Sequence, residues 1–428
     1  MQVKLAYGVG GRMVEVPDDA TVIVPTELPG LADADAAVSE ALDHPLSGSP
    51  LAMSAAGAAR VVVVFPDLTR PMPNRTVLPP VLRHLERCGI PDDAVTLLCA
   101  TGTHRQATPA EMRELVGPEI VARYAIIDHD ADSADHVAVG EVGGTPVLLQ
   151  RHYVEADVRI ITGFVEPHFF AGFSGGPKAV CPGLAATSTI LEAHHPRRIA
   201  DDDATFITRV GNPVHDFVRA AVALAPPHFS VDVAINRDRQ VTAVFAGPLD
   251  VAHDTACAFV QSSAVQRVEG PYDVVVSTNG GHPLDRNLYQ AVKGMAAAER
   301  IVRPGGIIVM AAACGDGIPA GGAFAEVLSR SRTPDDLLDA AGGPELDRWQ
   351  AQVLGRVLRR ATVWLYSGGL TDAMITDAML VPVHDLTTAV GDALSALGGS
   401  RRVAILPEGP LTVATVAPSA SVPGTTSP

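Results

Sequence analysis

Short apolar runs alternate with polar loops and helical patterns over the first two thirds of the chain. Residues 61–65 form one continuous apolar run, and two similar runs end shortly before Gly102 and Glu166. The segments between them have helical periodicity, although Pro79 and Pro80 limit where the first of these helices can begin. Apolar strands that alternate with helices predict a mainly parallel sheet covered on both faces.

A second set of strands and helices begins near Tyr272. A chain of 428 residues is too long for one ordinary core. We therefore expect two α/β domains, each with a mainly parallel sheet flanked by helices, at residues 1–265 and 270–415, with the active site in the interdomain cleft. Residues 416–428 are rich in Ser, Pro and Thr and are expected to form a disordered tail.

Polar side chains follow the ends of the three predicted strands of the first domain. They are Asp67, Thr69 and Arg70 after the first strand, His104 and Arg105 after the second, and His168 after the third. Ligands of open α/β sheets bind at the carboxyl ends of the strands. The pattern therefore predicts one crevice that receives groups from three loops.

Composition and charge argue against several kinds of partner and location. The net charge of −16 argues against a nucleic-acid partner. The five cysteines are odd in number and include no C-x-x-C pair, which fits a reducing compartment and no thiolate metal site. No apolar stretch is long enough to predict a membrane span, and we expect a cytoplasmic protein that does not bind membranes.

The segment "EPHFFAGFSGGPK" combines a histidine, a glycine loop and one amine. Its candidate phosphate-binding residues are Gly172, Ser174, Gly175 and Gly176. Glycines let backbone N–H groups approach an anion, but Pro177 and Ala179 beside Lys178 exclude the Walker pattern. A glycine turn with a solvated lysine is the structural alternative.

His104 and His168 are candidate acid and base groups, because imidazole exchanges protons near neutral pH. Each could instead be an ordinary surface or hydrogen-bonded histidine. Arg70 could bind a carboxylate or phosphate as a planar fork. Asp67 and Thr69 could equally cap a helix.

Two further groups carry weaker signals. A short helix, capped by Thr187 or Ser188 and stopped at Pro196, places His194 at its end, where it is an incomplete metal site or a cation at a helix C-terminus. In the second domain Gln290 and Lys293 share one helix face, and Tyr289 precedes them. Trp349 is a candidate wall of the substrate site or a core residue.

Taken together, the motifs "DLTRP", "GTHR", "EPHFFAGFSGGPK", "CPGLA" and "LYQAVK", with His194, resemble the nickel-pincer-nucleotide-dependent lactate racemase family over nearly the whole chain. The resemblance implies a racemase or epimerase of a small-molecule 2-hydroxy acid, lactate or a related 2-hydroxy carboxylate. It also implies hydride transfer at the substrate carbon and accessory enzymes that build the cofactor.

The implied cofactor is a pyridinium-3-thioamide-5-thiocarboxylic acid mononucleotide carrying Ni(II), attached covalently to Lys178. In this family the cofactor supplies two sulfurs and one carbon as nickel ligands. His194 matches the histidine that supplies the fourth ligand, and square-planar coordination suits Ni(II). The resemblance further implies catalysis by His104 and His168 and binding of the substrate carboxylate by Arg70. It matches Gln290 and Lys293 to second-domain residues that line the same cleft. It assigns Asp67, Thr69 and the glycine loop to the nucleotide. Pro66 departs from the family, which often has an acidic residue there.

Three other functions remain open at the level of the residues. An oxidoreductase of 2-hydroxy acids with a dissociable nucleotide would use the same histidines without the lysine attachment. A zinc hydrolase would combine His104, His168 and His194, although no carboxylate lies at metal-ligand spacing. A non-enzymatic protein that binds organic acids would need the same pocket but no turnover.

Overall fold

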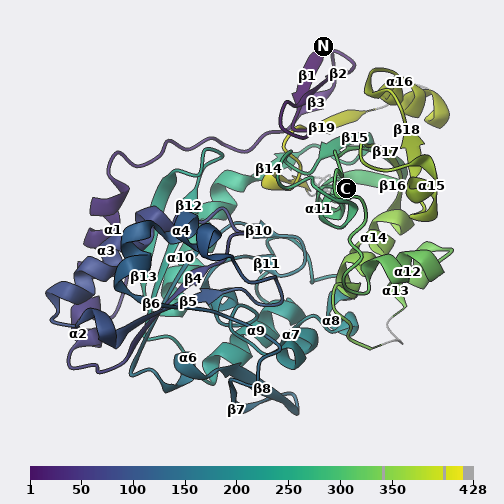
Figure 1. Ribbon diagram of the computed structural model, residues 1–428. Coiled ribbons are helices and arrows are strands. Elements are labelled where there is room, and N and C mark those ends of the chain that lie inside the picture. The colour runs from purple at the N-terminus through teal and green to yellow at the C-terminus, as the bar shows by residue number, and fades with distance from the viewer. Residues whose placement is uncertain (340–342, 399–401, 418–428) are drawn as a thin grey trace, which may run out of the picture. The chain divides into compact units, whose positions relative to one another are not determined.

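The computed structural model describes residues 1–339, 343–398 and 402–417, so most of the tail expected at 416–428 lies outside the described residues (Figure 1). The chain divides into two compact units, one of residues 26–263 and one of residues 1–25 together with 264–428. Both units are mixed α/β, as the sequence predicts.

A six-stranded sheet forms the centre of the 26–263 unit. Its spatial order is β13 (Val241–Gly247), β12 (Phe229–Ile235), β9 (Val158–Phe164), β4 (Val61–Pro66), β5 (Val95–Ala100) and β6 (Ala125–Asp128). All neighbouring pairs are parallel except β12 with β13. The three predicted strands β4, β5 and β9 are thus confirmed, and they are adjacent.

Both faces of this sheet are covered, which explains the continuous apolar run in β4. Val61, Val63 and Phe65 pack with one set of helices, and Val62 and Val64 pack with a second set. The first set includes α1 (Ala34–Asp43), α3 (Asn74–Arg87) and α4 (Pro109–Val116), and the second includes α6 (Arg151–Glu155), α7 (Thr187–Ala193) and α9 (Pro213–Ala223) (Figure 1). Pro79 and Pro80 lie inside α3, which begins five residues before them.

The remaining elements of this unit complete its fold. They are α2 (Leu51–Ala55), η1 (Asp92–Ala94), α5 (Pro118–Arg123), the β7 (His136–Val142)–β8 (Thr145–Gln150) hairpin, β10 (Pro167–His168) paired with β11 (Gly172–Phe173), η2 (Gly176–Ala179), α8 (Pro196–Ile199) and α10 (Leu249–Ala264).

The second unit contains a fully parallel six-stranded sheet. Its order is β18 (Val381–Val383), β17 (Ala361–Tyr366), β16 (Val302–Ala311), β15 (Tyr272–Thr278), β19 (Val403–Leu406) and β3 (Thr21–Val22). Helix α16 (Leu386–Leu397) shares an apolar cluster with one face, and α11 (Leu288–Glu299) and α14 (Arg348–Arg360) contact β16. The other elements are β1 (Gln2–Leu5), β2 (Arg12–Glu15), β14 (Val265–Val268), α12 (Phe324–Arg330), α13 (Pro334–Leu338), α15 (Asp372–Asp377), η3 (Gly409–Leu411) and β20 (Val413–Val416).

The first 25 residues differ from the expected arrangement, which placed them in the N-terminal domain. Strand β3 instead pairs with β19, and the Ala6 N–H donates to the Pro407 carbonyl at 2.9 Å. The apolar residues Leu5 and Val14 of the first hairpin pack on the second sheet. This long-range pairing leaves no local sign in the sequence.

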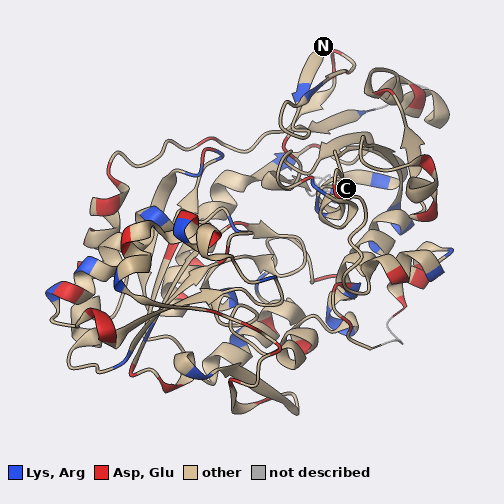
Figure 2. Ribbon diagram, in the orientation of Figure 1, with Lys and Arg blue, Asp and Glu red and all other residues tan. Residues whose placement is uncertain are grey.

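No helix among the described residues is both long and apolar enough to cross a bilayer. Acidic and basic residues are interspersed along the ribbon of both units (Figure 2). The expectation that the chain does not bind nucleic acid stays a prediction.

Tight packing of α11 on β15 gives the first testable expectation. A Cβ at Gly294 would lie 2.0 Å from the Thr278 carbonyl oxygen, whereas a Cβ at Gly391 in α16 would meet nothing within 4 Å. We expect Gly294→Ala to lower the free energy of unfolding by about 2 kcal/mol through overpacking. The matched Gly391→Ala should raise it by roughly 0.5 kcal/mol through helix propensity. Urea unfolding measures both, and equal effects would contradict the packing argument.

Candidate active site

A buried aspartate directly after β4 holds the first candidate histidine. The Asp67 carboxylate lies 3.0 Å from His104 Nδ1 and accepts the Thr69 hydroxyl at 2.9 Å. Burial alone raises the pKa of Asp67, but the hydrogen bond and charge of His104, with smaller contributions from Arg70 and Thr69, outweigh it and hold the pKa below its usual range. An ionised Asp67 only accepts, so Nδ1 of His104 carries a proton in either charge state, and in the neutral ring Nε2 has the lone pair.

A second aspartate anchors the loop that carries His104. Asp128, at the end of β6, accepts the Ala107 N–H at 2.6 Å and the Thr101 hydroxyl, and its carbonyl accepts from Gln106 Nε2 at 2.9 Å. These bonds hold the loop on both sides of His104. No motif in the sequence marks Asp128 as part of the site.

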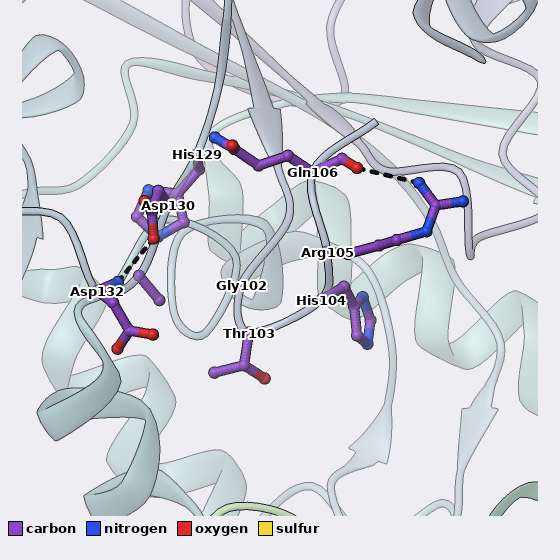
Figure 3. Close-up of a pocket in the computed structure, with 9 residues that line it drawn as sticks. Gly102, Thr103, His104, Arg105, Gln106, His129, Asp130 and Asp132 are labelled. Carbon is purple, nitrogen blue, oxygen red and sulfur yellow. Dashed lines mark hydrogen bonds between the residues drawn. The ribbon is translucent and has the colours of Figure 1, made fainter. Parts of the chain in front are cut away.

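A cavity of about 180 Å³ lies beside His104, lined by residues 102–106 and 129–132. The His104 ring and the carboxylates of Asp130 and Asp132 lie on opposite sides of it (Figure 3). Two exposed carboxylates make that side unfavourable for an anionic substrate. Arg70 lies three residues after Asp67 in the loop after β4, and its backbone N–H donates to the Asp67 carbonyl at 3.1 Å.

His168 lies in β10, after the third strand end. Its ring stacks on Phe169 at 4.8 Å between centroids and meets Phe170 edge-on at 4.5 Å. The Ala171 N–H donates to His168 Nδ1 at 3.3 Å, so this nitrogen bears the lone pair and the neutral ring carries its proton on Nε2. The two candidate histidines are thus held in opposite tautomers.

Lys178 and His194 converge on the same aromatic side chain. The Lys178 Nζ lies 5.7 Å from the Phe170 ring centroid, and the His194 ring meets Phe170 edge-on at 5.4 Å. Burial lowers the pKa of His194 to about 4, and the Lys178 charge acts in the same direction. His194 Nδ1 lies 2.8 Å from the Ile190 carbonyl, which can only accept, so the neutral ring presents its Nε2 lone pair. His194 follows α7, whose N-cap is Ala186 rather than the expected Thr187 or Ser188.

The glycine loop between His168 and Lys178 makes close contacts within the protein. A Cβ at Gly172 would lie 2.1 Å from the Thr208 carbonyl oxygen. The N–H groups of Ser174, Gly176 and Lys178 donate to Glu166, Asp232 and Gly175. The Ser174 hydroxyl accepts from the Glu166 N–H at 2.9 Å. Three N–H groups of the loop are therefore already bonded within the protein, and the expected phosphate role stays a prediction.

The other candidates belong to the second unit. Trp349 is buried, and its indole N–H donates to the Tyr289 hydroxyl at 3.0 Å. Gln290 and Lys293 lie on α11, whose first turn is capped by Asn287. The structure thus joins Trp349 to Tyr289. Their expected contact with the substrate stays a prediction.

Buried polar residues behind the glycine loop also escaped the sequence analysis. Asp232 and His253 are fully or almost fully buried and bond the loop backbone. An aspartate inside the apolar run of β12 was the available signal. Within the described residues, no group of three or more His, Cys, Asp or Glu side chains is arranged to hold a metal ion.

Similarity to known proteins identifies the family of the chain. Residues 7–206 match the lactate racemase N-terminal domain, and residues 267–414 match the lactate racemase C-terminal domain. The chain is 35% identical over 380 residues to a lactate racemase of Lactiplantibacillus plantarum, covering 87% of this chain and 89% of that protein. A lactate racemase of Thermoanaerobacterium thermosaccharolyticum is 33% identical, with 87% and 88% covered.

Solved structures agree with these matches. The lactate racemase apoprotein of T. thermosaccharolyticum superposes with a TM-score of 0.90 at 30% identity, covering 97% of this chain and all of that one. A Thermotoga maritima protein has a TM-score of 0.69 at 18% identity over 90% of this chain and 98% of its own, which shows the shared fold alone. The fold and these relatives define a two-unit α/β isomerase. The chain belongs to the lactate racemase family.

The buried histidine beside the cavity makes stability depend on pH. Burial lowers the pKa of His129 to about 4, against a partly opposing hydrogen bond to the Ala185 carbonyl. In the unfolded chain, the His129 imidazole takes up a proton near the ordinary histidine pKa. The folded chain resists this protonation, so the stability associated with neutral His129 is fully present above about pH 6.5 and is lost towards pH 4. We expect wild type to lose about 3 kcal/mol relative to His129→Gln across this window.

Urea unfolding from about pH 7.5 to about pH 4.5 measures this difference. Replacement of the exposed His44 by Gln is the control. Parallel stability curves for wild type and His129→Gln would contradict the assignment.

Proposed function

We propose that the chain is a racemase or epimerase of a 2-hydroxy acid, lactate or a related 2-hydroxy carboxylate. It works with a nickel-pincer nucleotide attached to Lys178, which accessory enzymes must build. The observation that carries the proposal is the convergence of Lys178 and His194 on Phe170, whose ring also contacts His168. The matches to lactate racemases support the substrate class.

The side chains near Phe170 suit such a cofactor. Lys178 offers a half-buried amine for a covalent bond. His194 is held neutral by burial and oriented by Ile190, which leaves the imidazole nitrogen donor that Ni(II) accepts. When bound, the nucleotide supplies a reversible acceptor for the hydride on the substrate Cα. This chemistry suits the reaction because a Cα–H beside a hydroxyl and a carboxylate is too weak an acid for imidazole to remove as a proton.

The protein itself handles the carboxylate and the hydroxyl proton. Arg70 is proposed to bind the substrate carboxylate through its planar fork. His104 Nε2 is proposed to accept the hydroxyl proton, with Asp67 stabilising the resulting imidazolium. His168 is proposed to take the mirrored role when the opposite enantiomer forms, exchanging the hydroxyl proton as imidazole and imidazolium.

The remaining proposed substrate contacts belong to the second unit. Tyr289, Gln290, Lys293 and Trp349 are the proposed contacts. Trp349 bonds Tyr289, which would fix the orientation of that ring.

Covalent attachment at Lys178 is the direct test of the function. Wild-type chain made in a nickel-supplied host that contains the cofactor-building enzymes should show an added mass and should invert single-enantiomer lactate. Lys178→Ala should lose both the adduct and the activity, whereas Lys4→Ala, on the exposed β1 hairpin, should retain them. Racemisation in D₂O with little deuterium at Cα supports hydride return, and extensive exchange would exclude it. A wild-type enzyme that turns over without the adduct would favour a dissociable nucleotide.

The Asp67–His104 pair gives a second expectation. Asp67→Asn leaves the geometry nearly unchanged but no longer stabilises a charged His104, so kcat should fall by about 10²- to 10⁴-fold with little change in KM. Intact mass should still show the Lys178 adduct. An unchanged kcat would remove His104 from the proton transfer. Retained lactate binding without turnover in a His104→Ala plus His168→Ala variant would separate catalysis from simple binding.

A further inference from the structure

A carboxylate lies in the core directly behind the glycine loop that precedes Lys178. Asp232 of β12 has no solvent exposure, its Oδ1 accepts the Gly176 N–H at 2.9 Å and its Oδ2 accepts the Ser230 hydroxyl at 3.2 Å. A buried carboxylate is costly unless hydrogen bonds compensate it. We therefore expect its two hydrogen bonds to have a role in the structure.

The neighbouring glycines make room for this carboxylate. A Cβ at either Gly163 or Gly175 would lie 2.9 Å from Asp232 Oδ1, closer than two such atoms approach without displacement. Gly175 and Gly176 also have φ angles of +75° and +48°, which favour glycine. The glycines expected to face a phosphate thus face Asp232 as well.

A histidine from helix α10 bonds the same loop. His253 of α10 lies with Nε2 3.0 Å from the Ser174 carbonyl oxygen, which can only accept, so this nitrogen donates. A Cβ at Gly176 would lie 2.4 Å from the His253 ring. Asp232 and His253 therefore fix the Ser174 carbonyl and the Gly176 N–H from two separate elements.

These two bonds come immediately before the turn that carries Lys178. The Lys178 N–H donates to the Gly175 carbonyl at 3.1 Å, and η2 begins at Gly176. The direction in which the lysine leaves the backbone is thus set by residues whose backbone is bonded to the core.

We propose that Asp232 and His253 are positioning residues for Lys178, holding the Ser174–Gly176 backbone so that the amine points towards Phe170 and His194. The inference rests on the proposed attachment at Lys178. It assigns the two buried groups a role in presenting the amine rather than in contacting the substrate.

The test uses amine labelling of the full-length chain without cofactor. The sequence contains only three lysines, Lys4, Lys178 and Lys293, so peptide mapping after pyridoxal phosphate and borohydride treatment gives each rate separately. Asp232→Ala removes the acceptor, and we expect the Lys178 labelling rate to rise about fivefold as the turn opens. The rates at Lys4 and Lys293 should stay unchanged.

Two control variants separate the bond from other effects. Asp232→Asn loses the charge but keeps an oxygen acceptor for the Gly176 N–H, so Lys178 should label within about twofold of wild type. The second control is His215→Leu, which changes a direct neighbour of His253, because the two rings stack with 5.9 Å between centroids. Within the described part of the chain, the His215 ring nitrogens make no hydrogen bond to the turn. This variant should label like wild type.

His253→Leu gives an independent route if Asp232→Ala does not fold. It removes the donor to Ser174 from α10 and should raise the Lys178 rate in the same way. Wild-type labelling of Lys178 in a folded Asp232→Ala or His253→Leu chain would overturn the proposal, as would an equal rise at all three lysines. Because these rates need no cofactor, a wild-type chain that never acquires the adduct would refute the attachment without altering this result.

Discussion

The parallel pairing of β9, β4 and β5 is the constraint on which the candidate site depends. Parallel strands end at the same edge of a sheet, so the loops after these three strands start as neighbours. One loop supplies Asp67, the next supplies His104, and the third leads through His168 to Lys178. The Gly102 N–H, which donates to the Gly183 carbonyl at 3.0 Å, joins the second loop to the segment after Lys178.

Hydrogen bonds to single atoms then decide what each histidine can do. An ionised aspartate fixes the proton on one nitrogen of His104, and a backbone N–H fixes the lone pair on one nitrogen of His168. His194 is kept neutral by burial and oriented by the Ile190 carbonyl. Three imidazoles of equal intrinsic chemistry thus present different nitrogen atoms as donor or acceptor because of their surroundings.

Much of this arrangement could be predicted, because its signals are local. The valines of β4 form a continuous run since both faces of the strand are covered, and polar residues after strand ends mark the carboxyl edge. The pairing of β3 with β19 could not be read in this way, because it joins opposite ends of the sequence. Asp232 and His253 were missed because a buried polar residue is recognised only once its partners are known. The close contacts of the glycines with Asp232 and His253 likewise appear only in the folded chain.

The pairing of β3 with β19 also affects the order in which the chain can fold during synthesis. Residues 26–263 contain their whole sheet and can close as soon as they leave the ribosome. The other sheet receives its edge strand β3 first and the neighbouring strand β19 last, so its edge stays open until residues 403–406 have been made. The lysine, histidines and aspartates of the first unit can therefore reach their folded geometry while the second sheet is still incomplete.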